Sequence, residues 1–290
     1  MSVKPPHRDL ATYLKEGVQT ALQNPLALGP FITIIFINFF ILEILYFSNR
    51  FPLSTFFGPI IERRWGELYL HYPLNFVVIP KLFQYFKVPL YILIVNFLIA
   101  VAIKIVVEVN SNKKISLKNA VRSLSAQYID IVIYSLISAG TLYFLYQINT
   151  FLTLKLWGVE IREETSSLLR TIILQGQAYW NLLLSALVTV VFAYVLPIIV
   201  VDQKKIMPAL KLNFKKFKQS WFFVLAVVLI PTLFYVPILL FKNSIALIAD
   251  KVFPEIWFWV LALTVVVTTA IDVVIYIVIT LDYLLEREHS

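Results

Sequence analysis

Long runs of apolar residues alternate with short basic segments along the 290-residue chain. An α-helix rises about 1.5 Å per residue, so roughly 20 apolar residues cross the hydrocarbon core of a bilayer. Six runs come close to this length, and each predicts a membrane span. They cover about residues 26–48, 88–109, 129–150, 179–201, 221–241 and 257–281. The pattern therefore predicts an all-α, polytopic helical membrane protein, with residues 1–290 forming a single six-span domain.

Amphipathic segments precede the first, third and fifth spans. In residues 202–220, helical spacing separates a basic face from an apolar stripe formed by Ile206, Leu210, Phe214 and Phe217. Residues 113–128 repeat the pattern with Leu117, Val121, Leu124 and Tyr128 on the apolar side, and residues 10–24 show it more weakly. Such helices are typical of segments that lie on a membrane and contact anionic headgroups. The expected headgroup-binding residues are Lys204, Lys205, Lys211, Lys215, Lys216, Lys218, Lys114, Lys118 and Arg122.

Three further segments between spans are assigned outside the membrane core. Residues 49–87 mix aromatic and charged side chains, which favours the membrane–water interface, and the part near 74–80 either stays there or enters the membrane as a re-entrant segment. Residues 151–178 are also expected at the interface, with a helix start at 163–166. Residues 242–256 are expected to form a short loop.

Basic residues are densest in the segments assigned to one side of the membrane. The positive-inside rule places those segments, together with both termini, in the cytoplasm. The first 25 residues lack the apolar core of a cleavable signal peptide. The protein is therefore expected to be a multi-pass protein of the cell membrane, either plasma or inner.

The amino-acid composition agrees with a protein that is embedded in a lipid bilayer. The chain is 60% hydrophobic and only 14% charged, whereas soluble domains are nearer half apolar and a quarter charged. Its net charge of +8 lies mainly in short loops, so lipid headgroups rather than nucleic acid are the expected partners. The chain has no cysteine, which excludes disulfides, thiolate metal sites and a cysteine nucleophile.

The chain also reads as three similar units. Each unit begins with an amphipathic helix and continues as a hairpin of two spans, over about residues 10–109, 113–201 and 206–282. The first two hairpins end on an aliphatic–acid pair, Val107–Glu108 and Val201–Asp202. Two interpretations stay open: a true structural repeat, or the pattern that any six-span protein with basic cytoplasmic loops would give.

A family resemblance rests on short motifs. They are Leu22–Gln23–Asn24–Pro25 before the first span, Leu196–Pro197–Ile198–Ile199–Val200–Val201–Asp202, Ala209–Leu210–Lys211 and the aromatic start of the fifth span at Trp221. These motifs resemble the YciC-like proteins and the membrane domain attached to some glycerophosphodiester phosphodiesterases. The resemblance implies a six-helix membrane fold. It does not imply phosphodiester hydrolysis, because no soluble phosphodiesterase domain accompanies the spans in this sequence.

Ionisable residues inside spans are the first candidates for function. Asp272 lies near the middle of the sixth span, where a short carboxylate must face other helices, be protonated or find a partner. Lys104 is the nearest cation by depth, so one hypothesis pairs it with Asp272, aided by Thr268 and Thr269. A proton or substrate role for Asp272 is the alternative.

Other acids within the spans are expected to be structural. Lys104 and Glu108 are four residues apart on one helix face and can pair with each other. Asp130, Asp202 and Asp282 lie with Glu108 at the cytoplasmic ends of spans, where loop lysines and water are close.

Three prolines interrupt spans: Pro197 in the fourth, and Pro231 and Pro237 in the fifth. Each removes a backbone donor, so each predicts a kink that either serves packing or lines a substrate path. The three histidines lack metal-ligand spacing, and no catalytic or phosphate-binding motif occurs. No catalytic residue, metal or cofactor is therefore predicted, and the chain is not expected to be an enzyme.

Two functional hypotheses follow. The first is a non-enzymatic subunit, scaffold or membrane-organising factor that binds anionic lipid on the cytoplasmic face and contacts other membrane-protein subunits. The second is a transporter or permease for a lipid-like or small amphipathic substrate. A polar cavity that reaches Asp272 would favour the second hypothesis.

Overall fold

The computed structural model describes residues 10–111, 116–157, 167–249 and 254–288. All regular secondary structure in these ranges is helical, which confirms the all-α fold class. The elements before the third predicted span are α1 (Leu10–Gln23), α2 (Pro25–Tyr46), α3 (Ser54–Trp65), η1 (Glu67–Leu70), α4 (Asn75–Leu90), η2 (Tyr91–Val95), α5 (Asn96–Asn110) and α6 (Leu117–Ser125). The remaining elements are α7 (Tyr128–Trp157), α8 (Ser167–Val191), α9 (Val195–Asp202), α10 (Ile206–Leu233), α11 (Val236–Ala249) and α12 (Ile256–Glu288).

Six helical segments in the described ranges are long and apolar enough to cross a membrane. They are Pro25–Tyr46, Asn75–Asn110, Tyr128–Leu152, Gly176–Asp202, Ile206–Leu233 and Ile256–Arg287. The protein is therefore a multi-pass membrane protein, as the apolar runs predict.

The second span begins much earlier than its apolar run indicates. It was expected at residue 88, but α4, η2 and α5 form one continuous helical segment from Asn75 to Asn110. Pro80 and Pro89 lie within α4 without ending it. The part of α4 before residue 88 buries Phe76, Val78, Ile79, Leu82 and Phe83 against the neighbouring spans. The interface assignment of residues 81–87 was therefore wrong, and residues 75–80, for which a re-entrant segment was the alternative, belong to the same long helix.

The fifth span is broken rather than straight. Ser220 has non-helical backbone angles (φ −122°, ψ 17°) and separates an amphipathic first part of α10 from an apolar second part, as the sequence predicts.

A turn at Phe234 and Tyr235 then separates α10 from α11. Because α11 continues to Ala249, the segment from residue 242 is helical there and the expected loop is shorter than predicted.

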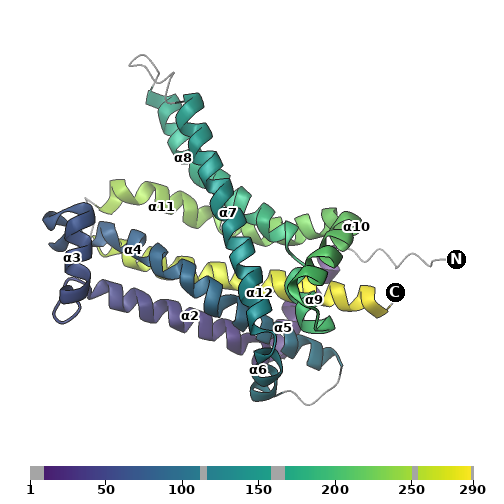
Figure 1. Ribbon diagram of the computed structural model, residues 1–290. Helices are drawn as coiled ribbons and strands as arrows, with labels where there is room; N and C mark the ends of the chain where they lie inside the picture. Colours follow the sequence, from purple (N-terminus) through teal and green to yellow (C-terminus); the bar gives the residue numbers. More distant parts are fainter. Residues whose placement is uncertain (1–9, 112–115, 158–166, 250–253, 289–290) are drawn as a thin grey trace.

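The segment between the third and fourth spans is also helical for most of its described length. The helix α7 extends to Trp157 and α8 begins at Ser167, so the predicted interfacial stretch at 151–178 merges with the two spans. The predicted helix start at 163–166 lies outside the described residues. In Figure 1, α7 and α8 cross the other long helices and project beyond them, whereas α2, α4, α11 and α12 run side by side. The six spans therefore do not form one parallel bundle.

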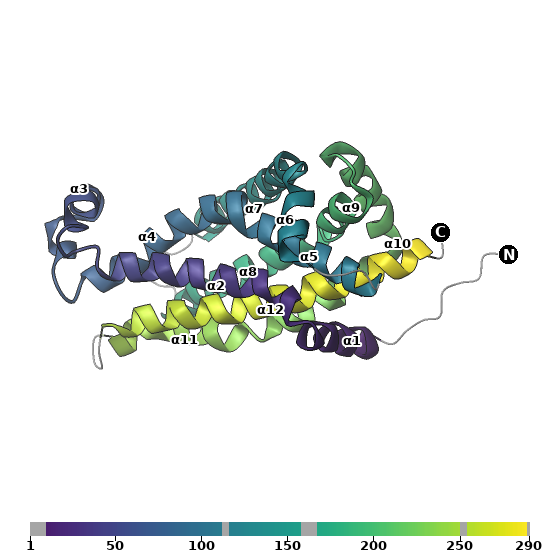
Figure 2. The ribbon, with the colours of Figure 1, turned by 90° about the horizontal axis from the view of Figure 1, so that it is seen from below.

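The amphipathic helices gather at one end of the molecule. Figure 2 shows α1 and the last turns of α12 at this end and α3 at the opposite end. We call these the α1 end and the α3 end. Two hydrophobic clusters divide the interior accordingly: a larger one around α5, α9 and the second half of α12, and a smaller one around α4 and the first half of α12.

Each amphipathic helix packs on the protein through a stripe of small or short side chains. The buried positions are Gly17 and Ala21 in α1, Ala120 and Leu124 in α6, and Ile206, Ala209 and Asn213 in α10. Small residues let helix backbones approach closely. Several residues of the predicted apolar stripes are exposed, namely Val18, Leu22, Leu117, Val121, Tyr128 and Phe214, whereas Leu124 and Ile206 are buried. The three amphipathic helices are present as predicted, and the contact of their exposed apolar residues with a membrane stays a prediction.

The element order matches the three proposed units, because an amphipathic helix precedes a helical hairpin in each. Whether the units share one geometry stays a prediction.

The closest approach in this packing is at Gly17, where a Cβ atom would lie 2.3 Å from Cγ2 of Val278 on α12. We predict that Gly17→Leu lowers the free energy of unfolding by about 1–3 kcal/mol, because the added side chain forces α1 away from α12. Thermal unfolding of the purified protein in detergent measures this change. Gly29→Leu is the matched control, since nothing lies within 4 Å of a Cβ at that helical glycine. Equal losses in the two variants would contradict this account of the α1 contact.

Candidate functional site

A cavity of about 520 Å³ lies between the two hydrophobic clusters. Helices α4, α8, α10, α11 and α12 form its walls, and Tyr146 of α7 completes the lining. The volume falls within the range of about 300–1,000 Å³ that is typical of small-molecule sites. The lining residues join the α7–α8 hairpin to helices of the other spans.

Four ionisable side chains line this cavity. Lys81 and Lys87 come from α4, Lys242 from α11 and Asp272 from α12. Lys81 and Lys87 are exposed, while Lys242 and Asp272 are half-buried, so all four are accessible from the cavity. Ionisable residues are costly inside a membrane protein and mark functional sites by default. Three lysines and one aspartate give the cavity a formal excess of positive charge.

Asp272 is one of the lining residues. It is about 24 Å along α12 from Ile256, which is close to the middle of that long helix. Lys87 lines the same cavity from α4. Lys104 instead lies 4.0 Å from Glu108 on its own helix, so the Lys104–Glu108 pair is confirmed and the Lys104–Asp272 pair is wrong.

Sequence reasoning missed the three cavity lysines for one reason. Lys81 and Lys87 lie in the segment that was assigned to the interface, and Lys242 lies in the segment that was assigned to a loop. Longer helices at α4 and α11 bring these residues to the walls of the cavity, where Lys81 and Lys87 stay exposed. The apolar residues that flank Lys81 and Lys87 indicate that the span begins before residue 88. Pro80 and Pro89 obscured this signal, because prolines usually mark the end of a helix.

Threonine hydroxyls add polarity to the cavity walls. Thr232 donates a hydrogen bond to the Val228 carbonyl (2.7 Å), and Thr268 donates one to the Thr264 carbonyl (2.8 Å). Their hydrogens are therefore used within their own helices, and their oxygens remain acceptors. Of the predicted helpers of Asp272, Thr268 lines the cavity and Thr269 does not. Donors for a bound molecule can come from the lysines and from uncharged lining residues such as Gln84 and Asn181.

The break in the fifth span borders the same cavity. Thr232 and Tyr235 lie beside the turn between α10 and α11, and both are lining residues. Pro231 precedes this turn and Pro237 opens α11, so both prolines mark the predicted break. Broken helices line substrate sites in many transporters.

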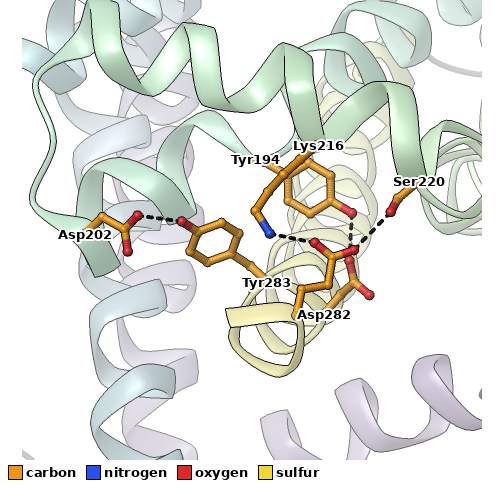
Figure 3. A network of polar contacts seen from close by, with 7 residues as sticks. Tyr194, Asp202, Lys216, Ser220, Asp282 and Tyr283 are labelled. Atoms are coloured by element: carbon orange, nitrogen blue, oxygen red, sulfur yellow. Dashed lines mark hydrogen bonds and ion pairs between the residues drawn. The ribbon is translucent and has the colours of Figure 1, made fainter. Parts of the chain in front are cut away.

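A second polar cluster closes the α1 end of the molecule. Figure 3 shows side chains of α9 and α10 converging on acids of α12. The Tyr194 hydroxyl donates to Asp282 (2.6 Å), and the Tyr283 hydroxyl donates to Asp202 (2.8 Å). Tyr194, Asp282 and Tyr283 are buried, so these bonds satisfy groups that water cannot reach.

Further pairs extend this cluster to its rim. The Lys216 ammonium lies 2.6 Å from Glu286, and the Ser220 hydroxyl donates to the same carboxylate (3.0 Å). Asp202 also lies 3.2 Å from the Lys204 ammonium and 3.4 Å from Nε of Arg287. The predicted structural role of the acids at the span ends agrees with these contacts.

Asp130 connects the third span to the start of α10. Its carboxylate accepts a hydrogen bond from the Ile206 backbone amide (2.9 Å). The first amides of a helix have no partner within the helix, so this bond satisfies one of them.

Pro197 interrupts the fourth span, and the buried side chain of Asn213 lies beside the interruption. The helix is interrupted at Phe192–Tyr194, between α8 and α9, as expected four residues before a proline. The Asn213 side chain donates to the Val191 carbonyl (2.8 Å) and accepts from the Tyr194 amide (3.1 Å). One amide group therefore satisfies two backbone groups that the break leaves without helical partners.

Most of the predicted headgroup-binding residues are exposed. They are Lys204, Lys205, Lys211, Lys215, Lys218, Lys118 and Arg122. Lys216 differs, because it points inward to Glu286 and over the ring of Tyr283 at 4.7 Å. Lys114 lies outside the described residues.

We predict that Asn213→Leu lowers the free energy of unfolding by about 2 kcal/mol or more, because it leaves a buried carbonyl and a buried amide without partners. Thermal unfolding in detergent measures the loss. Asn119→Leu on the exposed face of α6 is the control and should change the midpoint little. A stable Asn213→Leu variant would show that the break does not depend on this side chain.

Comparison with known proteins gives no match: no protein-family model, curated protein or solved structure is similar to this chain. Within the described ranges, no group of three or more histidine or acidic residues could hold a metal ion. Function must therefore be argued from the cavity and the charged surfaces alone.

Proposed function

We propose that this protein is a transporter or permease that takes a lipid-like or small amphipathic substrate into the cavity lined by Asp272. The observation that carries the proposal is the cavity itself, which brings Lys81, Lys87, Lys242 and Asp272 together among apolar spans. A purely structural bundle would gain nothing from placing four charged groups around one space among its spans.

The surrounding helices support movement of a substrate. The cavity lies between helices of both hydrophobic clusters, and α8, which crosses the other spans, forms one of its walls. The polar cluster around Tyr194 and Asp282 lies at the α1 end, beyond the cavity. We propose that this cluster closes one side of the transport path while the cavity receives the substrate from the other side.

The test is transport in proteoliposomes that contain the full-length protein and phospholipids with a fluorescent nitrobenzoxadiazole label. Dithionite quenches label only in the accessible leaflet, so the rate of further quenching reports movement across the bilayer. We predict that Asp272→Asn reduces this rate at least tenfold while the protein stays folded. Glu62→Gln, on the exposed surface of α3, is the control and should keep the full rate.

Two results would contradict the proposal. One is a rate no higher than that of protein-free liposomes for every labelled phospholipid, whatever its headgroup. The other is an unchanged rate in Asp272→Asn.

A second candidate is the non-enzymatic subunit or scaffold that binds anionic lipid on the cytoplasmic face. It is supported by the exposed lysines on the first part of α10, where Met207 and Phe214 are also exposed. An exposed surface with both apolar and basic side chains suits the headgroup region. Each lysine near an anionic membrane surface contributes about 1 kcal/mol.

For this candidate we predict that anionic lipid raises the unfolding temperature of the full-length protein in nanodiscs, and that salt reduces the gain. Changing Lys211, Lys215 and Lys218 together to Gln should remove most of the gain, because these exposed side chains supply the attraction. Arg63→Gln at the α3 end is the control. Equal stabilisation by neutral and anionic lipid would exclude the electrostatic contact.

A further inference from the structure

We propose that the substrate which the cavity binds is an anionic amphipath, with an acidic headgroup held by Lys81, Lys87 and Lys242 and an apolar portion against the adjoining helix walls. This inference rests on the proposed function and names its substrate class. The observation behind it is that three cationic side chains from two helices line one cavity whose walls also carry large apolar side chains.

The cavity has more positive than negative side chains, since three lysines and one aspartate line it. Lys81, Lys87 and Lys242 carry like charges and line one space, and Asp272 is the one carboxylate among the described lining residues. Within the described ranges, no ion pair within 4.0 Å joins any of the four cavity residues to another side chain. A bound anion would offset the repulsion between the lysines and accept their hydrogen bonds.

The rest of the lining mixes apolar and uncharged polar side chains, and its apolar residues come from several helices. Phe83, Leu182, Leu239, Leu261 and Ile271 come from four different helices and face the same space. Exposed apolar side chains continue outside it on α8 and α11, at Trp180, Leu240 and Phe241. Such a surface suits a hydrocarbon portion and does not suit a small hydrated ion by itself.

The charge pattern also excludes two other substrate classes. A cation would meet three lysines and only one carboxylate. A neutral or zwitterionic headgroup would leave the excess positive charge within the spans without compensation, which is costly in a medium of low dielectric constant. An acidic group such as a phosphate monoester, phosphodiester or carboxylate fits best.

The first experiment measures lipid binding to the full-length protein by native mass spectrometry in detergent. Phosphatidylglycerol and phosphatidylcholine with the same acyl chains are the two probes, so only the headgroup charge differs. We expect at least tenfold tighter binding of phosphatidylglycerol. Lys87→Gln combined with Lys242→Gln should abolish that preference, whereas Arg63→Gln combined with Arg64→Gln on the exposed surface of α3 removes the same charge and should preserve it.

Asp272→Asn separates this inference from the transport proposal. Removing the one carboxylate removes repulsion, so this variant should bind phosphatidylglycerol more tightly while losing transport. Preferential binding without any transport would support the substrate class and overturn the transport role. Transport with no headgroup preference would overturn the substrate class alone.

A labelling experiment keeps the test independent of variants that fold poorly. The chain has no cysteine, so Thr268→Cys introduces a single thiol that lines the cavity. Phosphatidylglycerol should slow its reaction with a maleimide at least fivefold, and phosphatidylcholine should not. Equal protection by both lipids would overturn the inference. Equal protection by inorganic phosphate would overturn the apolar part of it, because the ligand would then be a small anion.

Discussion

Polar groups within the spans of this chain must find partners inside the protein, because lipid offers them none. The fourth span shows how strict this requirement is. Pro197 interrupts the helix, and the backbone groups on either side of the interruption are satisfied by one buried side chain, Asn213, from a different span. This contact and apolar packing together hold α10 beside α8 and α9.

The same requirement organises the α1 end. Acids that end the spans are each paired with a hydroxyl, an ammonium, a guanidinium or a backbone amide from another helix, as Asp130, Asp202 and Asp282 show. These bonds join α7, α9, α10 and α12. They are directional, so they fix the relative rotation of helices whose apolar surfaces would otherwise slide over one another.

The charged groups of the cavity are placed differently from the paired acids at the α1 end. The lysines and the aspartate line a shared space and form no ion pair in the described ranges, and the threonine hydroxyls already donate to their own helices. Charged groups that remain accessible between two hydrophobic clusters are best explained by a molecule that completes them. This is the reason for placing function at Asp272.

Residue periodicity by itself determined the number of spans, the three amphipathic helices and the bend near Ser220, because each depends on local spacing of apolar and charged residues. Tertiary structure decided the rest. The extension of α4 and α11 past their prolines depends on burial against other spans, and it moves Lys87 and Lys242 from the predicted surface to the cavity. The depth of Asp272 within the sixth span identified it as a candidate, but depth alone could not identify its neighbours. Lys104 pairs with Glu108 instead. The direction of a side chain depends on how its helix is rotated against the other helices, and only the tertiary structure fixes that rotation.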